Sequence, residues 1–143
     1  MLPPGWLGSV RVSASWGRVG ADADGEFAVA GLARAGIDTR FVARLADATT
    51  FSCISLLTPD GEKALVKLMT PAYQPGAADV TKDAMADVGH VHLTSIGDHA
   101  LCRRVVEAAR GVGASASLDI ERADCPEDAS TLLDAIEGFD LVF

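Results

Sequence analysis

The sequence has few features that would tie the protein to a membrane or to secretion. No run of apolar residues approaches the roughly 20 needed to span a bilayer. Residues 1–17 lack a basic segment followed by an apolar stretch, so we expect no signal peptide. The chain has only Cys53, Cys102 and Cys125, with no CxxC pair. This sparse pattern favours free thiols in the cytoplasm over disulfides or a zinc site.

Basic residues are scarce relative to acidic ones. The 143 residues include 12 Lys and Arg against 20 Asp and Glu, which gives a formal net charge of −8. A chain this acidic is not expected to bind nucleic acid or an anionic membrane through its overall charge. A local phosphate site is still compatible with that charge. Hydrophobic residues make up 49% of the chain, which is typical of a soluble domain with a substantial core.

A regular order of elements begins after an unusual first segment. Residues 1–18 hold both tryptophans and follow no clear helix or strand period, so we take them as an atypical N-terminal segment. Beyond them, Asp22 or Asp24 can cap a helix that stops at Gly36. The sequence TPDGE at 58–62 is typical of a hairpin turn, because Pro fixes φ and Asp-Gly supplies a left-handed position. Strands are predicted over 39–46, 51–57 and 63–69.

The second half of the chain alternates strands with helices. A short helix is expected after Thr81, and Asp98 can cap a longer one that Gly111 or Gly113 closes. Pro126 suits the first turn of a third helix. The apolar face of the longer helix is predicted to hold Leu101, Val105, Ala108 and Val112. Strands are predicted over 90–95, 114–120 and 139–143. This alternation predicts an α/β fold with a parallel sheet covered by helices.

Short motifs follow one another in a specific order along the chain. They are VGADADG at 19–25, GIDT at 36–39, Thr50, PDGE at 59–62, Thr81, HLTS at 92–95, SLD at 117–119 and FDLVF at 139–143. Their order and spacing over about 19–143 resemble the N-terminal half of phosphofructokinase-B (PfkB) type carbohydrate kinases, the ribokinase-like family. The resemblance implies part of a ribokinase-like parallel sheet with flanking helices, into which a small β lid is inserted over about 39–69.

The resemblance also implies an activity, namely ATP-dependent phosphorylation of a sugar or sugar-acid hydroxyl. The full-length family uses ATP and Mg²⁺ for this reaction. The sequence contains neither the family's N-terminal Gly-Gly and Asn nor its late DTxGAGD-like motif. That motif carries the anion hole and the catalytic base. We therefore assign no catalytic, cofactor-binding or metal-binding residue, and we expect the chain by itself to be inactive.

Two alternatives to a kinase remain open. The chain could act as a binding or dimerisation module, because the lid hairpin forms dimer contacts in some relatives and a homodimer could form through its strands. It could instead be a poorly folding remnant whose apolar strand at 139–143 is left open at a sheet edge. As a binding module, the chain could also pair with a separate chain that carries the missing half. For a kinase, the expected partner is a small-molecule sugar, with no nucleic acid and no membrane, and the expected location is cytoplasmic.

Five residues are candidates for binding the sugar. Cys53, Ser55 and Lys67 lie on the predicted lid strands, and a lysine that faces the substrate would favour a sugar acid through charge pairing. The alternative is that Lys67 is a solvated strand residue. Thr94 and Ser95 end a parallel strand, at the edge of the sheet where ligands bind in such folds. Their alternative is a helix cap or a turn.

Two further sets of polar residues are interpreted as structural. Asp22 and Asp24 are placed to cap the first helix, because an acidic side chain there can accept from the exposed N–H groups of the first turn. His90 and His92 lie at i and i+2 on one side of a strand, a spacing that can hold a metal. No carboxylate or cysteine is close to them in sequence, so we expect both histidines to be structural.

Overall fold

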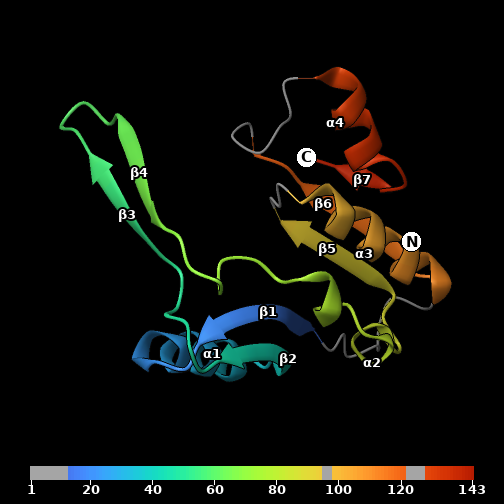
Figure 1. Ribbon diagram of the computed structural model, residues 1–143, viewed down its shortest axis with the longest axis horizontal. Coiled ribbons are helices and arrows are strands. Elements are labelled where there is room, and N and C mark those ends of the chain that lie inside the picture. Colours follow the sequence, from blue (N-terminus) through green and yellow to red (C-terminus); the bar gives the residue numbers. More distant parts are fainter. Residues whose placement is uncertain (1–12, 95–97, 122–127) are drawn as a thin grey trace, which may run out of the picture. The chain divides into compact units, whose positions relative to one another are not determined.

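The chain forms two compact units, Met1–Pro75 and Gly76–Phe143. A computed structural model describes residues 13–94, 98–121 and 128–143. The first unit contains the two-stranded sheet β1-β2 and the two-stranded sheet β3-β4, and the second contains the three-stranded sheet β5-β6-β7. Figure 1 labels these strands and the helices that accompany them.

The first unit begins with a β-α-β arrangement. Strand β1 (Ala14–Gly20) pairs in parallel with β2 (Asp38–Leu45), and helix α1 (Ala23–Arg34) connects them. A small core of Val19, Val29 and Val42 lies between the helix and the two strands. Strand β1 starts within the segment in which the sequence showed no strand period. Its first five residues are exposed or half-buried and only its last two are buried, so no alternation marks it.

Both ends of α1 agree with the sequence prediction. Asp22 is the N-cap, and its side chain accepts a hydrogen bond from the Gly25 N–H at 2.9 Å. At the other end Gly36 has φ +78°, a left-handed conformation that glycine adopts without strain. The Ile37 N–H then donates to the Leu32 carbonyl at 3.1 Å, which satisfies one of the free carbonyls of the last turn.

Strands β3 (Ser52–Leu57) and β4 (Lys63–Leu68) form the predicted antiparallel hairpin. The Thr58 hydroxyl accepts from the Glu62 N–H at 3.0 Å, and Gly61 supplies a left-handed residue with φ +92°. Thr58 also holds the pKa of the Asp60 carboxyl below its usual value through a side-chain hydrogen bond. Because β2 pairs with β1, the antiparallel pair consists of β3 and β4 alone. Which strands act as the lid stays a prediction.

The second unit is built on three parallel strands. Strand β6 (Ser115–Asp119) lies between β5 (His90–Thr94) and β7 (Leu141–Val142). A short 3₁₀ helix, η1 (Ala77–Asp79), and α2 (Lys82–Met85), capped by Thr81 as predicted, precede the sheet. Parallel pairing with helical crossovers in this unit, together with β1-α1-β2, confirms the predicted α/β class.

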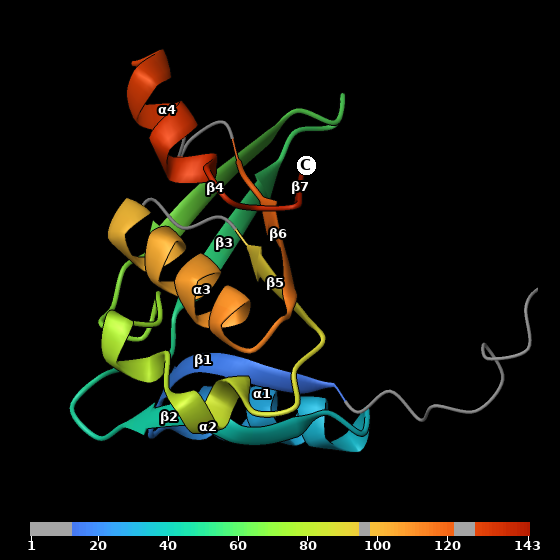
Figure 2. The same cartoon turned by 90° about the vertical axis from the view of Figure 1, so that its right-hand side faces the viewer.

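Helix α3 (His99–Gly111) covers one face of this sheet (Figure 2). Asp98 caps it as predicted, and Leu101 and Val105 are fully buried. The prediction that Val112 belongs to the apolar face is wrong, because the helix ends at Gly111 and Val112 is 47% exposed. The buried face turns instead toward Cys102, Val106 and Ala109.

Helix α4 (Ala129–Ile136) leads into β7 through polar contacts. Asp128 is its N-cap, and Pro126 lies outside the described residues. Beyond the helix, the Asp140 carboxylate accepts from the Ala116 N–H at 2.7 Å, and the Asp140 N–H donates to the Ala116 carbonyl at 2.8 Å. These two bonds fix where β7 meets β6. None of the helices in the described ranges is long and apolar enough to cross a membrane.

Candidate functional site

The hairpin brings three of the predicted sugar-binding residues onto one face. Cys53 lies directly opposite Lys67 in the antiparallel ladder, and Ser55 lies opposite Leu65. Opposed residues of such a ladder point to the same side of the sheet, and residues two apart on a strand share a face. Cys53, Ser55 and Lys67 therefore lie on one surface, which also carries Lys63 and the exposed Leu57 and Leu65, and we call it the polar face of the hairpin for its three candidate residues. Cys53 is a free, exposed thiol.

Lys67 is half-buried and contacts an aromatic residue that the sequence analysis missed. Its ammonium donates a hydrogen bond to the Tyr73 hydroxyl at 3.2 Å and lies 5.6 Å from the centre of that ring. The Tyr73 ring in turn packs on Phe51, with 4.5 Å between ring centres. Tyr73 follows β4 in an irregular segment, so no strand or helix period connects it with Lys67. The two residues come into contact because the chain turns back after β4.

The other side of the hairpin is apolar and exposed. It carries Ile54, Leu56, Val66 and Leu68, each between 45% and 54% exposed. We call this surface the apolar face of the hairpin. A two-stranded ribbon with one apolar side is marginally stable by itself in water, so it needs further contacts.

Thr94 lies at the carboxyl end of β5, as predicted for a ligand-facing position. In the ladder it is opposite Asp119, the last residue of β6, and both side chains are exposed. Because the carboxyl ends of parallel strands meet at one edge, a hydroxyl and a carboxylate are adjacent there. The N-cap of α3 is Asp98, so Thr94 does not cap that helix. Ser95 lies outside the described residues.

The two histidines of β5 are held by serines of β6. Ser117 is 2% exposed, and its hydroxyl lies 2.8 Å from His90 Nε2 and 2.8 Å from His92 Nδ1. His90 Nδ1 lies 2.7 Å from the Ser115 hydroxyl, which donates to the Gly89 carbonyl at 3.4 Å. Each imidazole thus forms a hydrogen bond with at least one serine hydroxyl of the neighbouring strand. No group of three metal-ligating side chains occurs within the described part of the chain.

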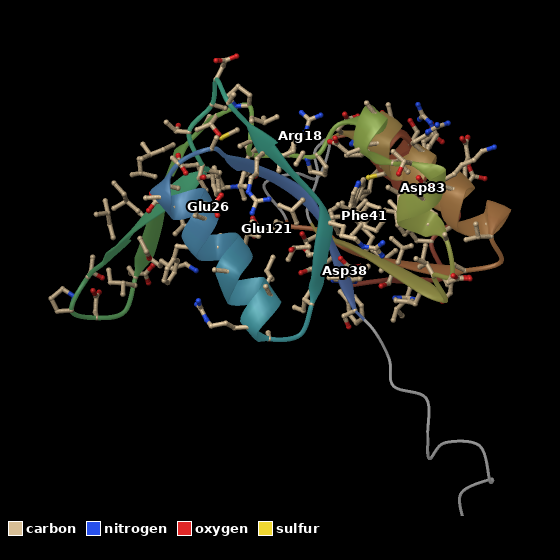
Figure 3. The ribbon with its side chains drawn as sticks, turned by 90° about the horizontal axis from the view of Figure 1, so that it is seen from below. Arg18, Glu26, Asp38, Phe41, Asp83 and Glu121 are labelled. Atoms are coloured by element: carbon tan, nitrogen blue, oxygen red, sulfur yellow. The ribbon has the colours of Figure 1, made fainter. Side chains whose placement is uncertain are left out.

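Exposed ion pairs occur among the described residues of the first unit, and Figure 3 labels the carboxylate residues Glu26 and Asp38 that take part in them. Glu26 on α1 accepts from Arg44 on β2 at 2.9 Å. Arg40 donates to Asp38 at 2.8 Å, and this hydrogen bond holds the pKa of the Asp38 carboxyl below its usual value. Exposed pairs contribute little to stability, so we interpret both as surface features rather than as part of a ligand site.

A comparison with known protein families shows to which family the chain belongs. A sequence model described as pfkB family carbohydrate kinase matches residues 5–143. The chain belongs to this family. The match begins ahead of the motifs at 19–25 and therefore includes part of the segment taken as atypical. No curated protein matches the sequence at a significant level.

Solved structures of sugar kinases share the fold of this pfkB family chain. A putative ribokinase II from E. coli in its apo form has a TM-score of 0.78 at 21% identity and is matched over 92% of this chain and 46% of its own. Fructokinase from Xylella fastidiosa has a TM-score of 0.75 at 23% identity, over 92% and 44%. Arabidopsis thaliana ribokinase with ribose and ATP has a TM-score of 0.71 at 21% identity, over 92% and 42%. The chain thus spans less than half the length of each.

The described residues of this chain do not show where ATP or Mg²⁺ would bind. The E. coli protein has also been solved with ATP and Mg²⁺, and the Xylella fructokinase with ATP. Mg²⁺ in such sites is held by carboxylates together with phosphate oxygens. Within the described ranges of this chain no three carboxylate, histidine or cysteine side chains gather into a metal site. We therefore derive no catalytic step through Mg²⁺ or ATP from these residues.

Proposed function

We propose that this chain supplies the sugar-covering lid and part of the sugar pocket of an ATP-dependent carbohydrate kinase that phosphorylates a sugar or sugar-acid hydroxyl. The observation that supports it best is the register of the hairpin. This register puts Cys53, Ser55 and Lys67 on one face, next to a tyrosine hydroxyl. Thiol, hydroxyl and ammonium groups on one side of a ribbon can donate to several oxygens of a polyol. In the second unit, Thr94 at the carboxyl edge of β5 stays a separate candidate for a sugar contact.

Within this class of substrates, a sugar acid fits the polar face better than a neutral sugar. The Lys67 ammonium keeps its position through the Tyr73 hydroxyl and ring, which reduces the entropy lost when it pairs with an anion. A carboxylate would then accept charge-assisted hydrogen bonds from Lys67 and a further hydrogen bond from Tyr73.

The transfer of the phosphoryl group requires more than this chain carries. No residue of the sequence matches the family's anion-hole helix or its catalytic base. We expect the purified 143-residue chain to hydrolyse no ATP in a sugar-dependent manner, and a coupled ATPase assay with a panel of sugars would test this. A cytoplasmic location stays a prediction.

The sugar-acid proposal can be tested by NMR titration of the chain with gluconate and with glucose. We expect gluconate to shift the amide signals of residues 52–68, with the largest changes near Cys53 and Lys67, and glucose to do so more weakly. Lys67→Met removes the charge and should abolish the preference for gluconate, since the neutral hydroxyl contacts remain.

The matched control for this titration is Lys63→Met. Lys63 lies on the same strand and face as Lys67, at the turn end of the hairpin, and it is exposed. The Lys63→Met variant should leave the preference for gluconate unchanged. Equal losses in the two variants would show that the chain attracts gluconate through general charge only, and the sugar-acid proposal would then be abandoned.

A homodimer is a proposal that the apolar face of the hairpin supports. The side chains of Ile54, Leu56, Val66 and Leu68 are each about half exposed, and an exposed apolar surface of this kind can pack against a second copy of itself. Sedimentation of the chain and of an Ile54→Lys variant would separate a dimer held by this face from a monomer.

A further inference from the structure

The Asp22 side chain does more than cap α1. Its Oδ1 accepts from the Gly25 N–H at 2.9 Å, which is the capping bond, and also from the Thr50 hydroxyl at 2.5 Å. Its Oδ2 accepts from the Thr50 N–H at 2.7 Å. Thr50 is 28 residues away in the sequence. A cap requires only the bond to Gly25, so the two bonds to Thr50 call for a separate explanation.

Thr50 occupies the point where the hairpin leaves the rest of the first unit, two residues before β3 begins at Ser52. Its hydroxyl accepts from the Gly20 N–H at 3.0 Å while it donates to Asp22. The last residue of β1, the N-cap of α1 and the first residue of the hairpin's entry are therefore joined by one carboxylate and one hydroxyl. We call this arrangement of Gly20, Asp22 and Thr50 the hairpin latch.

The two glycines of the VGADADG stretch make this close approach possible. A Cβ on Gly20 would lie 2.4 Å from the Ala48 carbonyl oxygen and 2.5 Å from the Thr50 nitrogen. A Cβ on Gly25 would lie 2.2 Å from the Gly20 carbonyl oxygen and 2.9 Å from the Thr50 hydroxyl. Backbone atoms cannot yield to such contacts as a flexible side chain can. Glycine at both positions thus serves the latch, although neither has an unusual φ.

The hairpin has no strand partner that could fix its direction in place of the latch. Within the described part of the chain, β3 and β4 pair only with each other. The bonds around Thr50 form a strong local restraint, because hydrogen bonds to a charged acceptor are stronger than neutral ones. In agreement with these contacts, the Thr50 hydroxyl is the first cause that lowers the pKa of the Asp22 carboxyl.

We propose that Asp22 is a positioning residue for the hairpin, which acts through Thr50 to set the direction in which the polar face leaves the β1-α1-β2 body. In an enzyme that closes this hairpin over a sugar, the latch is the fixed end of the hinge. This use of the hairpin rests on the proposed function, but the latch itself can be tested without sugar or ATP.

The test compares variants of the 143-residue chain by NMR, with two readouts. Amide exchange of Gly20 and Thr50 reports the latch directly, and ¹⁵N relaxation of residues 52–68 reports how freely the hairpin moves on the nanosecond timescale. Asp22→Asn retains a carbonyl oxygen that can cap α1 but loses the charge and one acceptor. Thr50→Val retains the shape but loses the hydroxyl.

In both variants we expect Gly20 to exchange faster, by about tenfold, the factor for losing one hydrogen bond in a charge-assisted set. We expect lower order parameters over 52–68, while residues 23–34 and 99–119 remain as in the parent chain. Thr50→Ser, which keeps the hydroxyl, should restore both readouts. Asp24→Asn, two residues further along in the first turn of α1, is the matched control and should change neither readout.

Two outcomes would overturn the proposal. If Asp22→Asn and Thr50→Val leave the relaxation of residues 52–68 unchanged, the latch does not direct the hairpin. If both variants loosen α1 and β2 as much as the hairpin, Asp22 is a cap for the whole unit and not a positioning residue. Because neither readout involves a ligand, a failed gluconate titration would leave this result unaffected.

Discussion

The two units of the chain obtain their structure by different means. In the second unit α3 buries Leu101, Val105 and Cys102 almost completely against a sheet whose Leu118 is 2% exposed. In the first unit the core between helix and sheet consists of Val19, Val29 and Val42. Beside this small core, the hairpin latch and two closely packed glycines hold the start of the hairpin against β1 and α1. Apolar packing tolerates small adjustments of shape, whereas a latch of this kind depends on individual atoms.

This difference has a consequence for how each unit should fail. A cavity in the second unit should lower the free energy of unfolding in proportion to the volume removed. A single added methyl group at Gly25 should be nearly as harmful as a large deletion elsewhere, because it separates groups that must be in contact. The predictions below follow this contrast from the largest expected effect to the smallest.

The largest effect is expected from Leu101→Ala in the second unit. Leu101 is 0% exposed, so the substitution leaves a cavity and should lower the free energy of unfolding by about 3 kcal/mol. Leu133→Ala is the control, because Leu133 is 63% exposed and its loss should cost less than about 0.5 kcal/mol. Urea denaturation followed by circular dichroism measures both. Similar costs for the two leucines would mean that α3 does not organise the core.

A slightly smaller effect is expected from Gly25→Ala in the first unit. The new Cβ would meet the Gly20 carbonyl oxygen, and the resulting overpacking should cost roughly 2 kcal/mol. Gly31→Ala lies in the same helix, where an added Cβ meets only the Arg34 side chain at 3.9 Å. That variant should be more stable than the parent chain, by up to about 1 kcal/mol, because alanine favours the helix.

These two glycines make the comparison decisive, since both substitutions add the same methyl group to one helix. Thermal unfolding of the two variants measures whether the changes in stability have opposite signs, a loss for Gly25→Ala and a gain for Gly31→Ala. If Gly25→Ala is tolerated as well as Gly31→Ala, the close approach at the latch does not matter for stability.

The smallest effect is expected at low pH and concerns the N-cap of α4, Asp128. The Asp128 carboxylate accepts from the Ser130 hydroxyl and from the N–H and hydroxyl of Thr131, and these bonds lower its pKa to about 2. A lowered pKa in the folded state means that the stabilisation is complete above the unfolded pKa of about 3.9. It is lost as the pH falls from about 4 toward 2. The protection factors of the amides in residues 129–136, corrected for the intrinsic exchange rate at each pH, should fall over this interval, and Asp128→Asn should remove this fall.

Much of the fold could be predicted where local chemistry decides it. Asp98 and Thr81 begin helices because each offers a side-chain acceptor to the N–H groups of the following turn. The sequence TPDGE makes the hairpin because Gly61 can take a left-handed conformation. These signals act over three to five residues and need no knowledge of the partner strands, so they are visible in a single sequence.

What could not be predicted depends on contacts between distant residues. The bond from Thr50 to Asp22 spans 28 residues. The sequence connects the two residues only in that both belong to the same ordered set of motifs. Tyr73 reaches Lys67 through a chain reversal that has no periodic pattern. Strand β1 lacks the alternation that identifies a strand, because parallel pairing with β2 and not burial defines most of its length.

The capping bond at Asp22 has one more consequence, for electrostatics. The turn from β1 into α1 has glycines at both ends and leads from a strand into a helix, as do the loops that cradle phosphates in nucleotide-binding folds. The positive end of the α1 macrodipole would attract a phosphate there. In this chain the Asp22 carboxylate already occupies that end and neutralises it. A second anion would meet repulsion at this position, so we expect this turn not to bind a nucleotide phosphate.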